Sequence, residues 1–551
     1  MTSTTSRPSA TPPPSTTPAV GGVQTVRRVI TYLLLATTVI IAASGLSGLL
    51  ERLLTVNLVE VSFDNFGLAT SLASALIAGP LAALLWWLTW RDSASARDRA
   101  SVVWPVYLVI LSTSALLTST IALFSWTANA ITSGWDPYGL SVGIVWGLVW
   151  LWHYWMWRHP RKGPTRLPGA APAIASLIGL IYLAGGLAFA LGRLIDSAVD
   201  SILGSVVVGD PVWQLVLQPL VWAAGGVLLW WWHWFRVGVR TQSFGFTNVL
   251  LVFIAGVASY AVLALGFTLT LSVVLELVTG LDQPIAVTLD PLGMAIASAV
   301  VGALVLVYHA RVVTAQSAGV RAATRLASAG VALAYAASGV GVTLNALLAT
   351  SSNSILEGNI RSLLLGGLSA LLVGGVLWWM TWRPLEASTP ERVATPGRRI
   401  YLVIIFGVSA LVALITLLVI GFQLFSFLLD GGSGESFIER SRQALGLLTA
   451  TVLVATYHFA IWNRDRVSDV REERVRRIDQ VMLVTSNDSA ELVDAVRAST
   501  GARVTVLMRA DAVQREPEVA EIVAALEGIE AGNVLVVAGV KGKVAVIRLK
   551  G

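Results

Sequence analysis

The side chains with the clearest capacity for chemistry are histidines set among aromatic residues. The chain has only five His, and four of them lie in such clusters, at His153, His233, His309 and His458. Three of the clusters share one form, an aromatic residue directly before the His: Trp152-His153, Tyr308-His309 and Tyr457-His458. Histidine is the usual axial ligand of haem and a common ligand of metal ions.

Two interpretations of these histidines compete. A haem held by two His needs them on facing helices at the same depth, and only the middle cluster offers a second one, His233. The alternative is hydrogen bonding to lipid or backbone at the membrane interface, and this is the interpretation we favour. We therefore expect no cofactor and no metal, and we keep His153, His309 and His458 only as candidates for cofactor binding.

The composition predicts the elements that carry these clusters. Of 551 residues, 55% are hydrophobic and 13% are charged, whereas a soluble protein carries about 25% charged residues. Apolar runs recur along most of the chain, so we expect an all-α polytopic membrane protein. The absence of Cys excludes disulfides and thiol chemistry. A net charge of +6 is small for this length and gives no indication of nucleic-acid binding.

About twelve transmembrane helices are predicted, arranged as hairpins. They lie at about 29–50, 66–90, 103–127, 139–157, 172–192, 212–235, 247–275, 291–310, 326–349, 363–382, 401–429 and 444–462. Arg27, Arg28 and the loops after the second, fourth, sixth, eighth and tenth spans contribute eighteen basic residues in total, against five in the loops inside hairpins. The positive-inside rule then predicts that both termini lie in the cytoplasm, and we expect the chain in the cell (inner) membrane.

Tryptophan gathers at the predicted cytoplasmic ends of three spans. LLWWLTW (84–90), LLWWWHW (228–234) and VLWWMTW (376–382) share the motif W-W-x-x-W. Because Trp favours the headgroup level, the motif predicts an aromatic belt rather than a cofactor box. The expected interfacial anchors are Trp86, Trp87, Trp90, Trp230, Trp231, Trp234, Trp378, Trp379 and Trp382.

The alternation of these motifs with the aromatic-His pairs predicts a threefold internal repeat. IAASGLSGLLERLL (41–54) also aligns with YAASGVGVTLNALL (335–348), and YLAGGLAFALGRLI (182–195) lies between them, with Gly45, Gly186 and Gly339 in register. We expect three tandem four-helix units at 26–170, 171–322 and 323–466. They follow a disordered Ser/Thr/Pro-rich tail at 1–25.

This repeat resembles an uncharacterised bacterial membrane family, a domain of unknown function built from a four-helix unit that occurs singly or in tandem. The resemblance covers about 25–466 and rests on W-W-x-x-W-R and the aromatic-His pairs. The chain departs from the pattern at Phe235, which stands where the other copies have Arg91 and Arg383. The resemblance implies an architecture and supplies no catalytic residues.

Ionisable residues near the bilayer midplane mark transport sites, and none is found in the predicted spans. Arg52 and Arg193 lie near the outer ends of spans and are candidates for binding a lipid headgroup or other anion. The favoured alternative is an interfacial Arg paired with Glu51 or Asp196. Gln214 and Gln218 lie in the outer half of the sixth span, beside Pro219.

The composition changes after Trp462. A charged linker at 467–474 precedes a small cytoplasmic α/β domain at 475–551, with a predicted β-α-β-α-β-β order. No phosphate-binding loop follows its first strand, so we expect it to bind a protein partner or small ligand.

No motif of a known catalytic site occurs, so we expect no catalytic residues and no enzyme. The favoured function is a membrane scaffold or sensor whose membrane part contacts lipids. The alternative is a transporter or lipid-handling protein with a pathway between the three units. The third is a haem or metal protein.

Overall fold

A computed structural model of the chain describes most of the sequence. The described residues are 20–55, 65–93, 101–132, 134–204, 211–242, 245–281, 283–350, 357–386, 396–431, 436–475, 478–486, 490–509, 517–527, 529, 531–540 and 543–549. They form two compact units, Met1–Trp382 with Thr416–Ala450 and Arg383–Ile415 with Thr451–Gly551. Helix α1 begins at Val20, so the predicted tail ends earlier than residue 25, and its first 19 residues lie outside the described ones.

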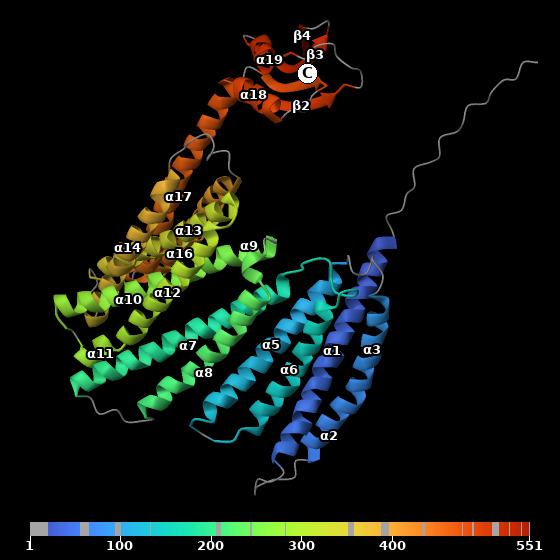
Figure 1. Cartoon of the computed structure of the whole chain (residues 1–551). Helices are drawn as coiled ribbons and strands as arrows, with labels where there is room; N and C mark the ends of the chain where they lie inside the picture. Colours follow the sequence, from blue (N-terminus) through green and yellow to red (C-terminus); the bar gives the residue numbers. More distant parts are fainter. Residues whose placement is uncertain are drawn as a thin grey trace, which may run out of the picture. The chain divides into compact units, whose positions relative to one another are not determined.

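Long helices make up the chain from Val20 to Val475 (Figure 1). The first group consists of α1 (Val20–Thr55), α2 (Asn65–Ala73), the π-helical turn η1 (Ser74–Ala78), α3 (Gly79–Asp92), α5 (Val103–Asn129) and α6 (Pro137–Arg158). The next consists of α7 (Ala170–Leu203), α8 (Val212–Trp231), η2 (Trp232–Arg236), η3 (Val239–Thr241), α9 (Gly245–Val252), η4 (Phe253–Ala258), α10 (Ser259–Thr279), α11 (Ile285–Leu289) and α12 (Leu292–Thr314). The last consists of α13 (Ala318–Ala349), α14 (Glu357–Glu386), α16 (Pro396–Leu429) and α17 (Phe437–Val475).

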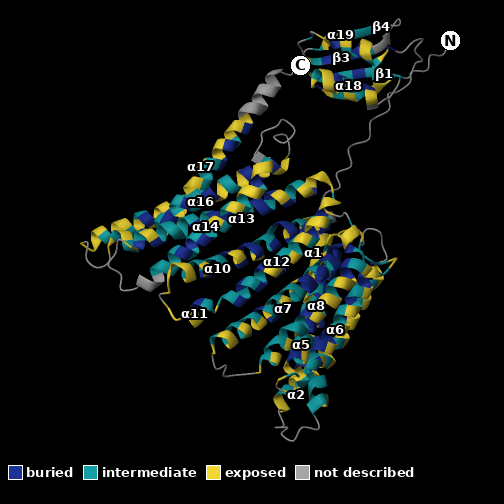
Figure 2. Cartoon of the chain, turned by 60° about the vertical axis from the view of Figure 1, so that its left-hand side comes forward, coloured by how far each residue is buried: buried dark blue, intermediate teal, exposed yellow. Residues whose placement is uncertain are grey.

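Eleven helical stretches among the described residues are long and apolar enough to cross a membrane. The predicted span at 139–157 corresponds to α6, a helix of 22 residues. It is not among the eleven, because it is rich in Trp, Tyr, His and Gly. The expectation of twelve therefore exceeds this count by one, while the mainly helical fold with many apolar helices is confirmed. Large apolar side chains remain exposed along these helices, as a lipid-facing surface requires (Figure 2).

Glycine sets how closely the paired helices approach within the larger unit. A Cβ at Gly186 on α7 would lie 2.5 Å from the backbone N of Ala223 on α8. A Cβ at Gly339 on α13 would lie 2.2 Å from the backbone N of Leu371 on α14, and one at Gly45 would lie 2.7 Å from that of Ala75. The three glycines that align in the sequence thus occupy the same kind of position, against the backbone of the following helix.

The C-terminal segment has the predicted β-α-β-α-β-β order. Its elements are β1 (Ile478–Thr485), α18 (Ala490–Thr500), β2 (Arg503–Met508), α19 (Val519–Leu526), β3 (Ala531–Val540) and β4 (Lys543–Leu549). The sheet order is β2-β1-β3-β4, with β1 parallel to β2 and β3, and β3 antiparallel to β4. Buried side chains of both helices and of β1 and β3, among them Leu483, Val496, Ile522 and Val536, form one hydrophobic core.

The sequence places Gly501 and Gly532 where the two helices of this segment are predicted to stop. Gly501 follows α18 directly and has a φ of +66°, the left-handed conformation that ends a helix. Gly532 lies inside β3, after α19 has already ended at Leu526. The helix-stop prediction is confirmed for Gly501 and wrong for Gly532.

Candidate functional site

The four clustered histidines share one backbone contact. Nδ1 of His153, His233, His309 and His458 lies 2.7–2.9 Å from the carbonyl oxygen four residues earlier, on Val149, Leu229, Val305 and Val454. A carbonyl only accepts, so each Nδ1 carries the proton and each neutral ring presents Nε2 as an acceptor. The predicted backbone hydrogen bond is therefore present in all four cases.

The histidines are buried rather than interfacial. His153, His309 and His458 are at most 1% exposed, so bonding to lipid is ruled out as their role. Nε2 of His153 accepts a hydrogen bond of 3.1 Å from the Tyr107 hydroxyl, which occupies the position a cofactor would need. Nε2 of His309 is buried and has no hydrogen-bond partner within the described residues. Among those residues no three His, Asp or Glu side chains are grouped so that they could hold a metal ion.

The Trp motif divides into inward and outward residues. Its first and last Trp stack on one another, with ring centroids 6.1 Å apart for Trp86–Trp90, 6.3 Å for Trp230–Trp234 and 6.4 Å for Trp378–Trp382. Trp234 and Trp382 are only 2% exposed. These two rings therefore have almost no surface to offer to lipid. The second Trp of each motif, Trp87, Trp231 or Trp379, is about half exposed, and its anchoring role stays a prediction.

His233 occupies a position that Thr fills in the other two motifs. Thr89 donates to the Leu85 carbonyl at 2.9 Å, and Thr381 donates to the Leu377 carbonyl at 2.9 Å. His233 makes the same bond to Leu229. All three side chains thus donate a hydrogen bond to the carbonyl one turn earlier. This shared bond explains why Thr and His can occupy the same position, with no need to invoke a cofactor.

The two candidate anion-binding arginines lie beside carboxylates. Arg52 interacts electrostatically with Glu51, and Arg193 with Asp196. Both carboxylates were the partners that the sequence suggested for an interfacial Arg. A nearby negative charge lowers the positive potential that an anion would meet at either position.

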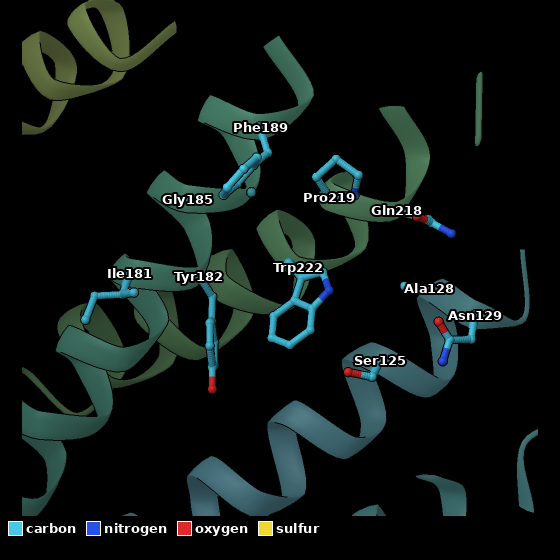
Figure 3. A pocket seen from close by; sticks show the side chains of 11 residues that line it. Ser125, Ala128, Asn129, Ile181, Tyr182, Gly185, Phe189, Gln218, Pro219 and Trp222 are labelled. Atoms are coloured by element: carbon cyan, nitrogen blue, oxygen red, sulfur yellow. The ribbon is translucent and has the colours of Figure 1, made fainter. Parts of the chain in front are cut away.

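A crevice lies between α5, α7 and α8 in the larger unit, and we call it the α5–α7–α8 crevice. Its volume is about 420 Å³, and it is lined by Ser125, Ala128, Asn129, Ile181, Tyr182, Gly185, Gly186, Phe189, Gln218, Pro219 and Trp222. Figure 3 shows Ser125 and Asn129 on one helix, Tyr182 and Phe189 on a second, and Gln218 and Trp222 on the third. None of the described residues that line it carries a charged side chain.

Two adjacent glycines on α7 build this crevice. Gly186 holds α7 against α8, because any side chain there would meet the Pro219 carbonyl oxygen at 2.5 Å. Gly185 also lines the crevice, and no heavy atom lies within 4 Å of a Cβ built at this position. Pro219 cannot donate a backbone hydrogen bond, which leaves the carbonyl one turn earlier without this helical partner.

Aromatic contacts fix the walls of the crevice. The rings of Tyr182 and Trp222 are 5.4 Å apart and edge to face, and Phe124 contacts both. The Tyr182 hydroxyl lies 3.2 Å from Thr120 Oγ1, and the Gln218 amide donates to Thr132 Oγ1 at 3.2 Å. The sequence had singled out Gln218 and Pro219 as polar or irregular features but gave no indication that three helices converge on them.

The smaller unit contains a buried ion pair that the sequence did not predict. Arg398 Nε lies 2.7 Å and Nη2 3.2 Å from the two carboxylate oxygens of Asp465, with both side chains less than 10% exposed. Arg398 also donates to the Leu385 carbonyl. The pair therefore joins α16 to α17 and to the end of α14.

Comparison with known families gives two matched segments. The model of a family described as "Domain of unknown function (DUF5671)" matches residues 28–148 and 320–457. These segments contain most of α1 to α6 and most of α13 to α17. Two separate parts of the chain are thus similar to the same uncharacterised family. The chain matches no curated protein and no solved structure.

Proposed function

We propose that the chain is a non-enzymatic membrane sensor that binds an uncharged amphiphilic ligand in the α5–α7–α8 crevice. The observation that carries this proposal is the lining of the crevice, which combines aromatic rings with amide and hydroxyl groups and has no charge. Small-molecule sites have this character, a mostly apolar wall with a few polar groups, and begin at about 300 Å³.

The exposure of the crevice supports entry from the lipid. Ile181 and Phe189, which lie on its rim, are 57% and 56% exposed. A ligand that reaches them through the bilayer needs an apolar body. The hydroxyl and amide groups of Ser125, Asn129 and Gln218 then favour a ligand with one or two uncharged hydrogen-bonding groups.

The link to the C-terminal segment supports a sensor. Helix α17 is continuous from Phe437 to Val475, and β1 begins at Ile478. A single helix thus joins the last apolar stretch to an α/β segment with its own core. In this proposal the α/β segment is a cytoplasmic module that binds a protein partner or small ligand.

The architecture that we propose is three tandem four-helix units in a bacterial inner membrane, at 26–170, 171–322 and 323–466. Equivalent contacts at Gly45, Gly186 and Gly339, and equivalent Trp stacks, support the repeat. The two family matches fall on the first and third of these units. The Trp belt is reduced in this proposal to Trp87, Trp231 and Trp379.

The proposed orientation predicts opposite labelling at two exposed positions. The chain has no native Cys, so single substitutions give no background. Ser201→Cys, near the end of α7, should react with an impermeant maleimide in intact cells, whereas Ala315→Cys, in the turn after α12, should react only after permeabilisation. The reverse pattern would contradict cytoplasmic termini.

Filling the crevice should remove the ligand and leave the fold intact. Leu at Gly185 places a large side chain in open space within the crevice, so Gly185→Leu should reduce the co-purified small molecule by at least about tenfold. Gly375→Leu is the matched control, because Gly375 also has open space around its Cβ position and does not line the crevice.

The measurement is mass spectrometry of organic extracts from equal amounts of the purified wild type and both variants. A molecule present in the wild type and the control but depleted in Gly185→Leu supports the proposal. Equal amounts in all three proteins, at equal thermal stability, would rule the crevice out as the binding site.

A lipid-handling function is the second candidate, favoured by the exposure of Ile181 and Phe189. It places the crevice on a pathway between the first and second proposed units. Movement of a fluorescent uncharged lipid between leaflets of reconstituted vesicles, faster than in protein-free vesicles and slowed by Gly185→Leu, would select this candidate over a sensor.

A further inference from the structure

A second concave surface lies between α1 and α3, and we call it the α1–α3 groove. Its volume is about 920 Å³, and its lining includes Gln24, Arg27, Arg28, Thr31, Arg91 and Asp92. The described lining contains three guanidinium groups and one carboxylate, so it has an excess of positive charge. It differs in this from the α5–α7–α8 crevice, which has no charged lining.

In this groove the guanidinium group of Arg91 is held against an aromatic ring. Arg91 lies over the ring of Trp87, with its guanidinium carbon 5.3 Å from the ring centroid. Its contact with Asp92 is long, 3.4 Å, and both side chains are about 60% exposed, so that pair contributes little. The wall behind is rigid, because Tyr32 packs on Trp104 and Tyr107 with centroids 5.4 and 5.1 Å away.

The three arginines supply most of the hydrogen-bond donors in the groove, and the Gln24 amide adds to them. The Thr31 and Thr89 hydroxyls already donate to the backbone carbonyls of Arg27 and Leu85. Arginine offers five N–H donors in a planar fork that matches phosphate oxygens and is always charged. A ligand that satisfies this surface is anionic and has several acceptor oxygens.

We infer that the α1–α3 groove binds a phosphate group. The phosphate can belong to an anionic lipid headgroup or to a small soluble phosphate ester. The motif residue Arg91 explains part of the W-W-x-x-W-R pattern, since the Trp one turn earlier positions its guanidinium. In the middle copy Phe235 replaces this Arg, so we assign the phosphate site to the first unit and not to the second.

The test is binding by the full chain purified in a neutral detergent. Native mass spectrometry would compare phosphatidylglycerol, phosphatidylcholine and glycerol 3-phosphate with the wild type and with an Arg27→Gln/Arg91→Gln variant. The expected result is saturable binding of phosphatidylglycerol or glycerol 3-phosphate that weakens about tenfold or more in the variant, since two charge-assisted contacts are lost. Which of the two ligands saturates the site identifies its source.

A control separates a built site from general positive charge. Arg311→Gln removes an exposed charge near the end of α12, on the same predicted side of the membrane. It should bind like the wild type. Equal weakening in Arg311→Gln, or unchanged binding in the groove variant, would overturn the inference. If the double variant fails to fold, exposed Arg91→Gln alone gives the same comparison.

Discussion

Replacing Asp465 by Ala is expected to destabilise the protein by about 3–5 kcal/mol, the largest effect of any single polar substitution that we predict. Asp465 takes two hydrogen bonds from Arg398, and both side chains are less than 10% exposed. The substitution removes the carboxylate partner of the Arg398 guanidinium, whose charge stays buried. The unfolding midpoint of the purified protein, followed by tryptophan fluorescence during SDS titration, measures the loss.

Two further variants serve as controls for that result. Asp430→Ala removes the carboxylate of an exposed pair, Arg440 Nη1–Asp430 Oδ2 at 3.0 Å, and should cost less than about 1 kcal/mol. Arg398→Met combined with Asp465→Leu removes both charges and should recover most of the stability. A cost for Asp465→Ala no larger than that for Asp430→Ala would mean that the pair does not hold α16 and α17 together.

Valine at the inward glycines is expected to separate the paired helices. A Cβ at Gly186 would lie 2.5 Å from backbone atoms of α8, and one at Gly374 would lie 2.3 Å from the backbone N of Ala336 on α13. Backbone atoms cannot rotate away as a side chain can, so Gly186→Val and Gly374→Val should each cost about 1–3 kcal/mol or more. Thermal unfolding in detergent measures each cost.

The neighbouring glycines are matched controls for this prediction. Gly185 and Gly375 have no heavy atom within 4 Å of a built Cβ, and each is the sequence neighbour of one of the inward glycines. Gly185→Val and Gly375→Val should unfold within a few degrees of the wild type. If Val at Gly185 and Gly186 had equal effects, close approach of α7 and α8 through Gly186 would be disproved.

Local spacing in the sequence was sufficient to predict the helical hairpins and the C-terminal element order. Gly45, Gly186 and Gly339 align in the sequence and face the backbone of the next helix in the structure. The stacking of Trp230 on Trp234 also follows from a spacing of four, which places both on one helix face. The belt interpretation treated all three Trp of a motif alike and therefore missed the burial of Trp234.

The crevice and the ion pair could not be predicted because they depend on packing between distant segments. Asn129, Tyr182 and Gln218 come from three helices, and no spacing within one helix brings them together. Asp465 lies just before the predicted charged linker, and its buried partner Arg398 is 67 residues earlier in the chain. Burial of the histidines likewise depends on neighbours such as Tyr107 on another helix.

The most direct test of the proposed binding site is an experimental structure of the full chain in nanodiscs made with its native lipids. The proposal predicts continuous ligand density in the α5–α7–α8 crevice, in contact with the rings of Tyr182 and Trp222 and within hydrogen-bond distance of Gln218 or Asn129. The same density should be absent from Gly185→Leu. A wild-type crevice that holds only water, or that is closed by its own side chains, would contradict the proposed function.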